Sequence, residues 1–183
     1  MKKPTIEFNI SKDYEGIFDK PEPARNNTPE WWKRQSRYQR ESVHTYNAKG
    51  EVSHTIKRCM PVMDAMITGY VIKLPSDLVV QQVHGEPVFV WGFTEWGLIS
   101  PHNPEQVTEY PKDDRWHPQP LKFINPWAIR TPKGYSCLFT APMHGDKLPF
   151  HILDGIVDTD VFNVPVNFPF FIEDKFEGTI PAG

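Results

Sequence analysis

The chain has 183 residues and carries 20 Lys and Arg against 23 Asp and Glu, a formal net charge of −3, so a dominant nucleic-acid-binding signature is absent. The N-terminal Met1-Lys2-Lys3-Pro4 precedes no apolar signal-peptide core, and no run approaches the roughly 18 apolar residues of a membrane span. We therefore expect a protein of the cytoplasm, or of an assembly made there, with no membrane segment.

Proline and aromatic content predict the fold class. Nineteen prolines limit helix length, because proline fixes φ and removes a backbone donor, and 13% aromatic residues favour pleated surfaces. We predict one mainly β domain over residues 1–183, a compact or distorted barrel of short strands with one N-terminal helix and long Pro-rich loops. Residues 1–54 are expected to form an N-terminal appendage, and residues 55–183 the β core.

The appendage is predicted to contain a strand, a connector and a helix. Apolar residues alternate over residues 5–10, which predicts the strand, and the connector covers the Pro-rich residues 19–30. Thr28 is expected to cap the helix, with Pro29 at its first position. We expect this helix to run to Arg40 and to be the longest of the chain.

The β core is predicted to begin with a short helix over residues 60–66, which Pro61 starts and Gly69 ends. The turn signal His84-Gly85-Glu86-Pro87 separates two β-branched runs, and residues 94–116 are typical of a loop. The predicted strands cover residues 70–74, 78–83, 88–93, 121–124, 127–130, 135–140, 155–157 and 164–172.

No metal-binding or nucleophilic motif is complete. The seven histidines show no i, i+4 pairing around a carboxylate, and neither Cys59 nor Cys137 belongs to a CxxC pair, so we expect no metal site. Without a secretory signal, both cysteines are expected to be free thiols. Gly134-Tyr135-Ser136-Cys137 lacks the second glycine of a nucleophile elbow, which disfavours a hydrolase of that type.

Three carboxylates lie within Asp154-Gly155-Ile156-Val157-Asp158-Thr159-Asp160. In a strand, Asp158 and Asp160 would point to one face, where they could orient a water molecule or bind a divalent cation. The alternative is a structural turn in which Asp side chains accept from local backbone amides. The apolar pair Ile156-Val157 indicates a buried strand just before Asp158, and we favour the structural turn.

This segment resembles the third motif of the trimeric deoxyuridine triphosphatases, Gly-x-Ile-Asp-x-Asp-Tyr-x-Gly, with Asp158 and Asp160 in place. Upstream, Ser136 matches the serine of the family's Arg-Ser-x-Leu. The resemblance implies a β-clip fold, activation of the attacking water by Asp158, phosphate contacts from Ser136, and Mg²⁺ as the cofactor; without that activity no cofactor is expected. Tyr135 replaces the family's arginine and Val161 its base-stacking tyrosine, so the resemblance favours the fold over the chemistry.

A second set of motifs covers nearly the whole chain. It consists of Pro21-x-Pro23-Ala24-Arg25, Pro29-Glu30-Trp31-Trp32-Lys33, Thr55-Ile56-Lys57-Arg58-Cys59, Asn125-Pro126-Trp127, Gly134-Tyr135-Ser136-Cys137-Leu138-Phe139 and Gly155-Ile156-Val157-Asp158-Thr159-Asp160. In these motifs the chain resembles a family of unknown function that occurs in tailed phages and some bacteria. The resemblance implies a phage-type viral protein, located in the virion or the host cytoplasm.

Tryptophans on Pro-rich segments are the candidate contact residues. Trp31, Trp32, Trp96 and Trp116 lie in or beside such segments, and aromatic residues on rigid loops make good interface anchors, with core packing as the alternative role. We expect a non-enzymatic structural or assembly protein that contacts other virion proteins or forms a homo-oligomer. The alternative is a deoxyuridine-triphosphatase-like nucleotide pyrophosphatase or nucleotide-binding protein that uses the residues of the triphosphatase resemblance.

Overall fold

The computed structural model describes residues 4–39, 52–92 and 96–183. Strands make up 30% of these residues and helices 16%, so the predicted mainly β class is confirmed. The described strands form one sheet of four strands, one of three and three of two, and these sheets do not close into a barrel.

The chain divides into two compact units. The first, here called the β unit, comprises residues 1–20, 72–141 and 148–183. The second, here called the helical unit, comprises residues 21–71 and 142–147. Both α-helices and one two-stranded sheet belong to the helical unit, and the other sheets belong to the β unit.

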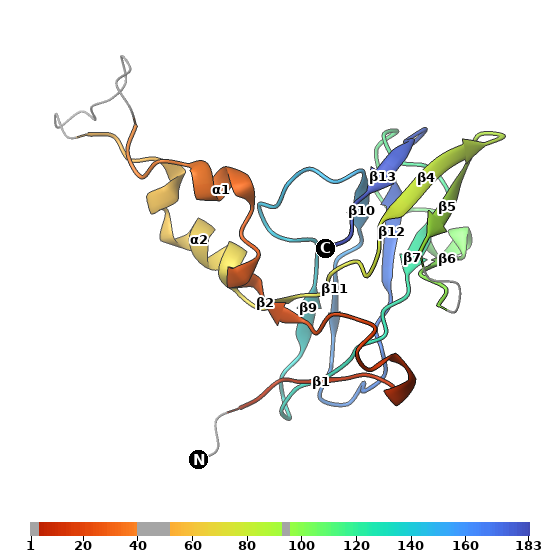
Figure 1. Cartoon of the computed structure of the whole chain (residues 1–183), viewed down its shortest axis with the longest axis horizontal. Helices are drawn as coiled ribbons and strands as arrows, with labels where there is room; N and C mark the ends of the chain where they lie inside the picture. Colours follow the sequence, from red (N-terminus) through yellow and green to blue (C-terminus); the bar gives the residue numbers. More distant parts are fainter. Residues whose placement is uncertain (1–3, 40–51, 93–95) are drawn as a thin grey trace. The chain divides into compact units, whose positions relative to one another are not determined.

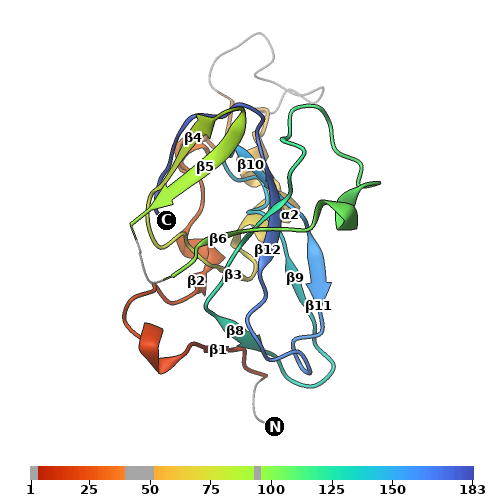
Figure 2. The same cartoon turned by 90° about the vertical axis from the view of Figure 1, so that its right-hand side faces the viewer.

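A three-stranded antiparallel sheet forms one wall of the core of the β unit (Figures 1 and 2). Its strands, in spatial order, are β13 (Gly178–Ile180), β4 (Leu78–Val83) and β5 (Glu86–Trp91). Leu78 and Val80 are at most 1% exposed, because alternate residues of β4 face the core. His84 and Gly85 adopt φ of 55° and 86° between β4 and β5, so the predicted turn is confirmed at these two residues as a tight hairpin, while Glu86 and Pro87 already belong to β5. Phe93, the predicted end of the second strand, lies outside the described residues.

A four-stranded antiparallel sheet supplies the opposite part of this core. Its strands, in spatial order, are β10 (Phe150–Ile152), β12 (Phe168–Ile172), β7 (Leu121–Phe123) and β6 (Ile99–Pro101). The rings of Phe123 and Phe170 stack at 4.0 Å between centroids, and Phe170 and Ile172 are fully buried. These residues form one core cluster with Leu78 and Val80 of the other sheet. The sequence predicts β7 and β12 but not the three-residue strands β6 and β10.

Two small antiparallel pairs complete the β unit. They are β1 (Glu7–Asn9) with β8 (Ala128–Arg130), and β9 (Cys137–Phe139) with β11 (Gly155–Val157); the 3₁₀ helices of this unit are η1 (Lys12–Tyr14) and η4 (Pro104–Val107). Asn125 is buried, and its side-chain amide donates to the carbonyls of Trp127 at 2.8 Å and Val166 at 3.1 Å. The Asn125 side chain therefore links the backbone at Trp127 to the backbone at Val166, in place of strand pairing.

The helical unit is built from short elements. They are β2 (Glu22–Pro23), η2 (Ala24–Asn26), α1 (Glu30–Arg34), η3 (Ile56–Arg58), α2 (Met60–Ile67) and β3 (Tyr70–Val71), with β2 antiparallel to β3. Figure 1 shows α1 and α2 in red-orange and yellow. Pro61 lies in the first turn of α2, as predicted, and α2 is the longest described helix.

The predicted helix over residues 29–40 is wrong in its cap and its length. Pro29 itself occupies the capping position, with ψ of 154°, so Thr28 makes no cap. The backbone turns extended at Gln35, and Arg37 then accepts a hydrogen bond from the amide of Thr55 at 3.2 Å. This pairing with a distant segment overrides the local helix pattern. Arg40, the predicted last residue, lies outside the described residues.

Both cysteines are unpaired. Cys59 lies in the helical unit and Cys137 in the β unit, and each is a free thiol, as predicted. Among the described residues, no helix has the length and apolar character needed to cross a bilayer.

Replacement of Phe170 by Ala tests the aromatic core. Phe170→Ala is expected to lower the free energy of unfolding by about 3–5 kcal/mol, because it removes a fully buried ring and its stack on Phe123. Chemical denaturation followed by tryptophan fluorescence measures this loss. The control Ile17→Ala truncates a half-exposed side chain and should cost less than about 1 kcal/mol. Equal losses in the two variants would contradict the proposed core.

Candidate functional site

The structure brings together Ser136, Asp158 and Asp160, the three residues singled out in the sequence. Pairing of β9 with β11 places Cys137 opposite Val157, so Ser136 and Asp158 meet just beyond the paired residues. The Ser136 hydroxyl donates to Asp158 Oδ1 at 2.7 Å. The amide of Gly134 donates to Asp160 Oδ2 at 2.8 Å. Each of these two carboxylates therefore accepts a hydrogen bond from the segment of residues 134–136, which strand pairing brings beside it.

A buried pair of threonines, Thr131 and Thr159, stabilises the turn that carries Asp158 and Asp160. Thr159 is fully buried between the two aspartates, and Thr131 is 8% exposed. Their hydroxyl oxygens lie 2.8 Å apart, and the Thr131 hydroxyl also contacts the carbonyl oxygen of Tyr135 at 2.6 Å. Sequence reasoning missed Thr159, whose only signal is its place between two aspartates. Its burial fixes the direction in which the flanking carboxylates point.

The backbone of Asp158 closes the turn. Its carbonyl accepts from the amides of Val161 at 3.1 Å and Phe162 at 2.8 Å. The geometry is that of a backbone hydrogen-bonded turn, whereas the Asp158 side chain accepts from the Ser136 hydroxyl and the Asp160 side chain from the amide of Gly134. Asp158 and Ser136 are nevertheless exposed, so the Asp158 carboxylate remains accessible to water. Among the described residues, no group of three or more His, Cys, Asp or Glu is placed to hold a metal ion.

An exposed apolar surface surrounds this turn. We call it the β9–β11 surface; its members are Tyr135, Leu138, Ile156, Val161, Phe162 and Val164, which are 45–74% exposed. Leu138 and Ile156 lie opposite each other in the register of the two strands, so they share one face. The expected burial of the strand at Ile156 is wrong, because that side chain is 74% exposed. In the described residues this sheet has two strands only, β9 and β11.

The four candidate tryptophans contact other residues of the chain. Trp32 is 6% exposed. Three of the four are half-buried: the Trp31 indole donates to the carbonyl of His144 at 2.9 Å, that of Trp96 donates to Ile124 at 3.3 Å, and Trp116 stacks on His151 at 5.6 Å. Of the four, Trp32 is a core residue, and the other three keep part of their surface exposed.

Replacement of Thr159 by Val tests the support beneath the turn. Thr159→Val keeps the shape but removes the hydroxyl bonded to Thr131, and should lower the free energy of unfolding by about 1–2 kcal/mol. The matched control is Thr179→Val on β13, an exposed threonine, for which the change should stay within about 0.5 kcal/mol. The measurement compares the denaturant midpoints of the two variants with that of the parent. A Thr159→Val midpoint equal to the parent's would mean that the hydroxyl pair does not stabilise the turn.

Comparison of the chain with known proteins gives no family assignment. No protein-family model, no curated protein and no solved structure matches it. Inference about function therefore starts from the chain's own surfaces and contacts.

Proposed function

We propose that the chain is a non-enzymatic β-domain that acts through protein–protein contacts and assembles with copies of itself. The observation that carries the proposal is the β9–β11 surface, where Leu138 and Ile156 expose more than half of their side chains on one face. Exposed apolar surface is a mark of interaction sites in proteins. The motifs that resemble the tailed-phage family make the virion the proposed setting for these contacts.

The chemistry of the β9–β11 surface suits a protein partner. Burial of a Leu, Ile, Val or Phe side chain contributes about 1.5–3 kcal/mol, and the surface holds six large apolar or aromatic side chains. The members are 45–74% exposed, so a partner would gain about half of this value per side chain, and the sum over the surface is comparable with the roughly 4–15 kcal/mol that association costs in lost freedom. Assembly through this surface is therefore energetically reasonable.

The strands themselves favour a partner. A two-stranded sheet is marginal in water, and both β9 and β11 have one edge without a described neighbouring strand. Free edges of this kind can accept an added strand from another chain. A partner would thus bury the apolar face and pair the free backbone groups at once.

The nucleotide-pyrophosphatase alternative rests on the hydrogen bond between Ser136 and Asp158. In such an enzyme Asp158 would activate water and Ser136 would contact phosphates, with Mg²⁺ as cofactor. A described pocket of about 290 Å³ lies elsewhere in the β unit. Its lining includes Tyr14, Trp96 and Pro126 but no charged side chain, so it is poorly suited to a triphosphate.

The double variant Leu138→Ser/Ile156→Ser tests the proposed function. Parent protein should assemble as concentration rises, and the variant should remain a monomer whose melting temperature matches that of the dilute, unassembled parent, because both side chains are exposed within one chain. Native mass spectrometry and light scattering measure the assembled mass. The control Ile17→Ser/Val90→Ser removes two other exposed apolar side chains, both outside the β9–β11 surface, and should assemble like the parent. A parent that stays monomeric at every concentration would overturn the proposal.

A direct assay separates the contact function from the enzymatic alternative. With Mg²⁺ and deoxyuridine triphosphate or other nucleoside triphosphates, the parent should release no pyrophosphate and should show no nucleotide-dependent rise in melting temperature. Asp158→Asn provides the control, since Ser136 can still donate to the remaining side-chain oxygen. Pyrophosphate release by the parent that Asp158→Asn abolishes without changing the melting temperature would establish the enzyme instead.

A further inference from the structure

Charge is divided unevenly between the two units. Residues 21–71 and 142–147 carry nine Lys and Arg against six Asp and Glu, a net charge of +3. The remaining residues carry eleven against seventeen, a net charge of −6, and the two values sum to the −3 of the whole chain. The nearly neutral total therefore conceals a basic unit and an acidic unit.

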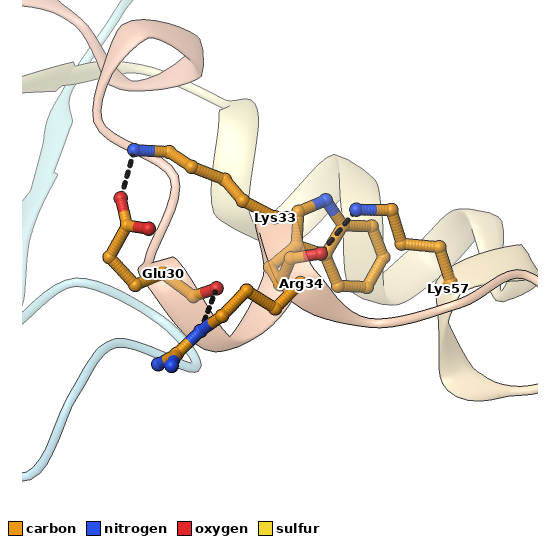
Figure 3. Close-up of polar contacts among 5 residues, drawn as sticks. Glu30, Lys33, Arg34 and Lys57 are labelled. Carbon is orange, nitrogen blue, oxygen red and sulfur yellow. Dashed lines mark hydrogen bonds and ion pairs between the residues drawn. The ribbon is translucent and has the colours of Figure 1, made fainter.

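The positive charge gathers where two segments of the helical unit meet. We call this the basic surface; it consists of Lys33, Arg34, Arg37, Lys57 and Arg58. Lys57 lies with its ammonium nitrogen 4.7 Å from the centre of the Trp32 ring, and it donates to the Trp32 carbonyl (Figure 3). The amide of Gln39 donates to the carbonyl of Ser53 at 3.0 Å. These contacts join residues 31–39 to residues 52–60 as one surface.

Little of this charge is neutralised within the described residues. Glu30 pairs with Lys33 at 2.6 Å, and this hydrogen bond lowers the pKa of the Glu30 carboxyl (Figure 3). Among the described residues, it is the one carboxylate that forms an ion pair with the basic surface. Arg34 and Arg37 are exposed, and Arg58 is exposed while it donates to the Tyr38 hydroxyl at 2.9 Å.

Apolar side chains are exposed among these cations. Tyr38, Ile56 and Met60 are 46–57% exposed on the same two segments. A surface that mixes arginine with exposed apolar and aromatic side chains has the composition of a protein-interface core and rim. It needs a partner that is both apolar and acidic.

The β9–β11 surface has that chemistry. The sequence contains no Lys or Arg from residue 134 to 146 or from residue 148 to 174. Asp154, Asp158 and Asp160 lie between or beside the exposed apolar residues of β11 and its turn. The basic surface and the β9–β11 surface thus complement each other in charge and in apolar character.

We propose that the basic surface of one copy binds the β9–β11 surface of a second copy, in a head-to-tail contact. This inference rests on the proposed function and specifies its partner and geometry. A contact between two different surfaces is heterologous, so each copy keeps one surface of each kind free for the next copy. Such contacts build closed rings or open filaments rather than isolated two-fold dimers.

A complementation experiment with two variants tests the head-to-tail contact. The first is Leu138→Ser/Ile156→Ser, which disrupts the β9–β11 surface and leaves the basic surface intact. The second is Arg34→Glu/Arg37→Glu, which reverses the charge of two exposed side chains and leaves the β9–β11 surface intact. Each variant alone should be a monomer, and an equimolar mixture should form a 1:1 heterodimer that grows no further. Native mass spectrometry distinguishes these species by mass.

The alternatives give different results. If Arg34→Glu/Arg37→Glu assembles like the parent, the contact is two-fold through β9–β11 alone; the head-to-tail inference is then overturned while the proposed function stands. If the parent never assembles, both fail. If Arg34→Glu/Arg37→Glu loses binding to a single-stranded oligonucleotide but assembles normally, the basic surface serves nucleic acid and the inference is overturned.

Controls separate charge from folding. Arg25→Glu/Lys147→Glu changes the charge of the helical unit equally but outside the basic surface, and should assemble like the parent. The single variants Arg37→Glu and Asp154→Lys change one exposed side chain each and should weaken parental assembly in the same direction. Raising salt from about 0.01 M to about 1 M shortens the screening length from about 30 Å to about 3 Å, and should weaken assembly at least about tenfold. Salt-independent assembly would contradict the charge-matched contact.

Discussion

The β unit depends on aromatic packing at Phe170, a residue of β12 that is fully buried. Its ring stacks on Phe123 of the neighbouring strand and belongs to the same cluster as Leu78 and Val80 of the other sheet. Nineteen prolines keep the strands short, so backbone ladders alone cannot hold the chain together. Side-chain burial joins two sheets of three- to six-residue strands into one core.

Because the two larger sheets form the core cluster, the smaller strand pairs of the β unit can serve other purposes. The β9–β11 pair contributes to no described larger sheet, and side-chain hydrogen bonds around Thr159 hold its turn. Local polar contacts thus fix the shape of a surface whose apolar residues remain exposed. Charge is also divided unevenly, since the helical unit has a net charge of +3 and the β unit a net charge of −6.

The sequence predicts the fold where the cause is local. Proline and aromatic content indicate the mainly β class, Pro61 marks the start of α2, and His84-Gly85 marks the tight hairpin, because each of these depends on backbone conformation near one residue. The helix expected to reach Arg40 fails for the opposite reason. Its backbone leaves the helical conformation at Gln35, and the next residues pair with residues 53–55, far along the chain.

The candidate site shows the same limit. Sequence motifs single out Ser136, Asp158 and Asp160. Pairing of β9 with β11 then brings Ser136 and Asp158 into hydrogen-bond contact. Whether Ile156 faces a core or solvent depends on how many layers cover its sheet, which no local pattern of three residues reveals. The net charge of the whole chain is limited in a similar way. The sum of −3 hides the difference in charge between the two units, on which the proposed assembly depends.

The distribution of lysine and arginine also decides which reagents can report on each surface. Residues 134–146 and 148–174 offer no amine for acylating labels and no cleavage site for trypsin, so lysine-directed footprinting cannot detect the β9–β11 face. Carboxyl-directed labels would reach Asp154 and Asp158 there, and amine-directed labels would reach Lys33 and Lys57 on the basic surface. A carbodiimide joins only carboxylates to amines in direct contact, so covalent capture of these two groups would record which surfaces meet.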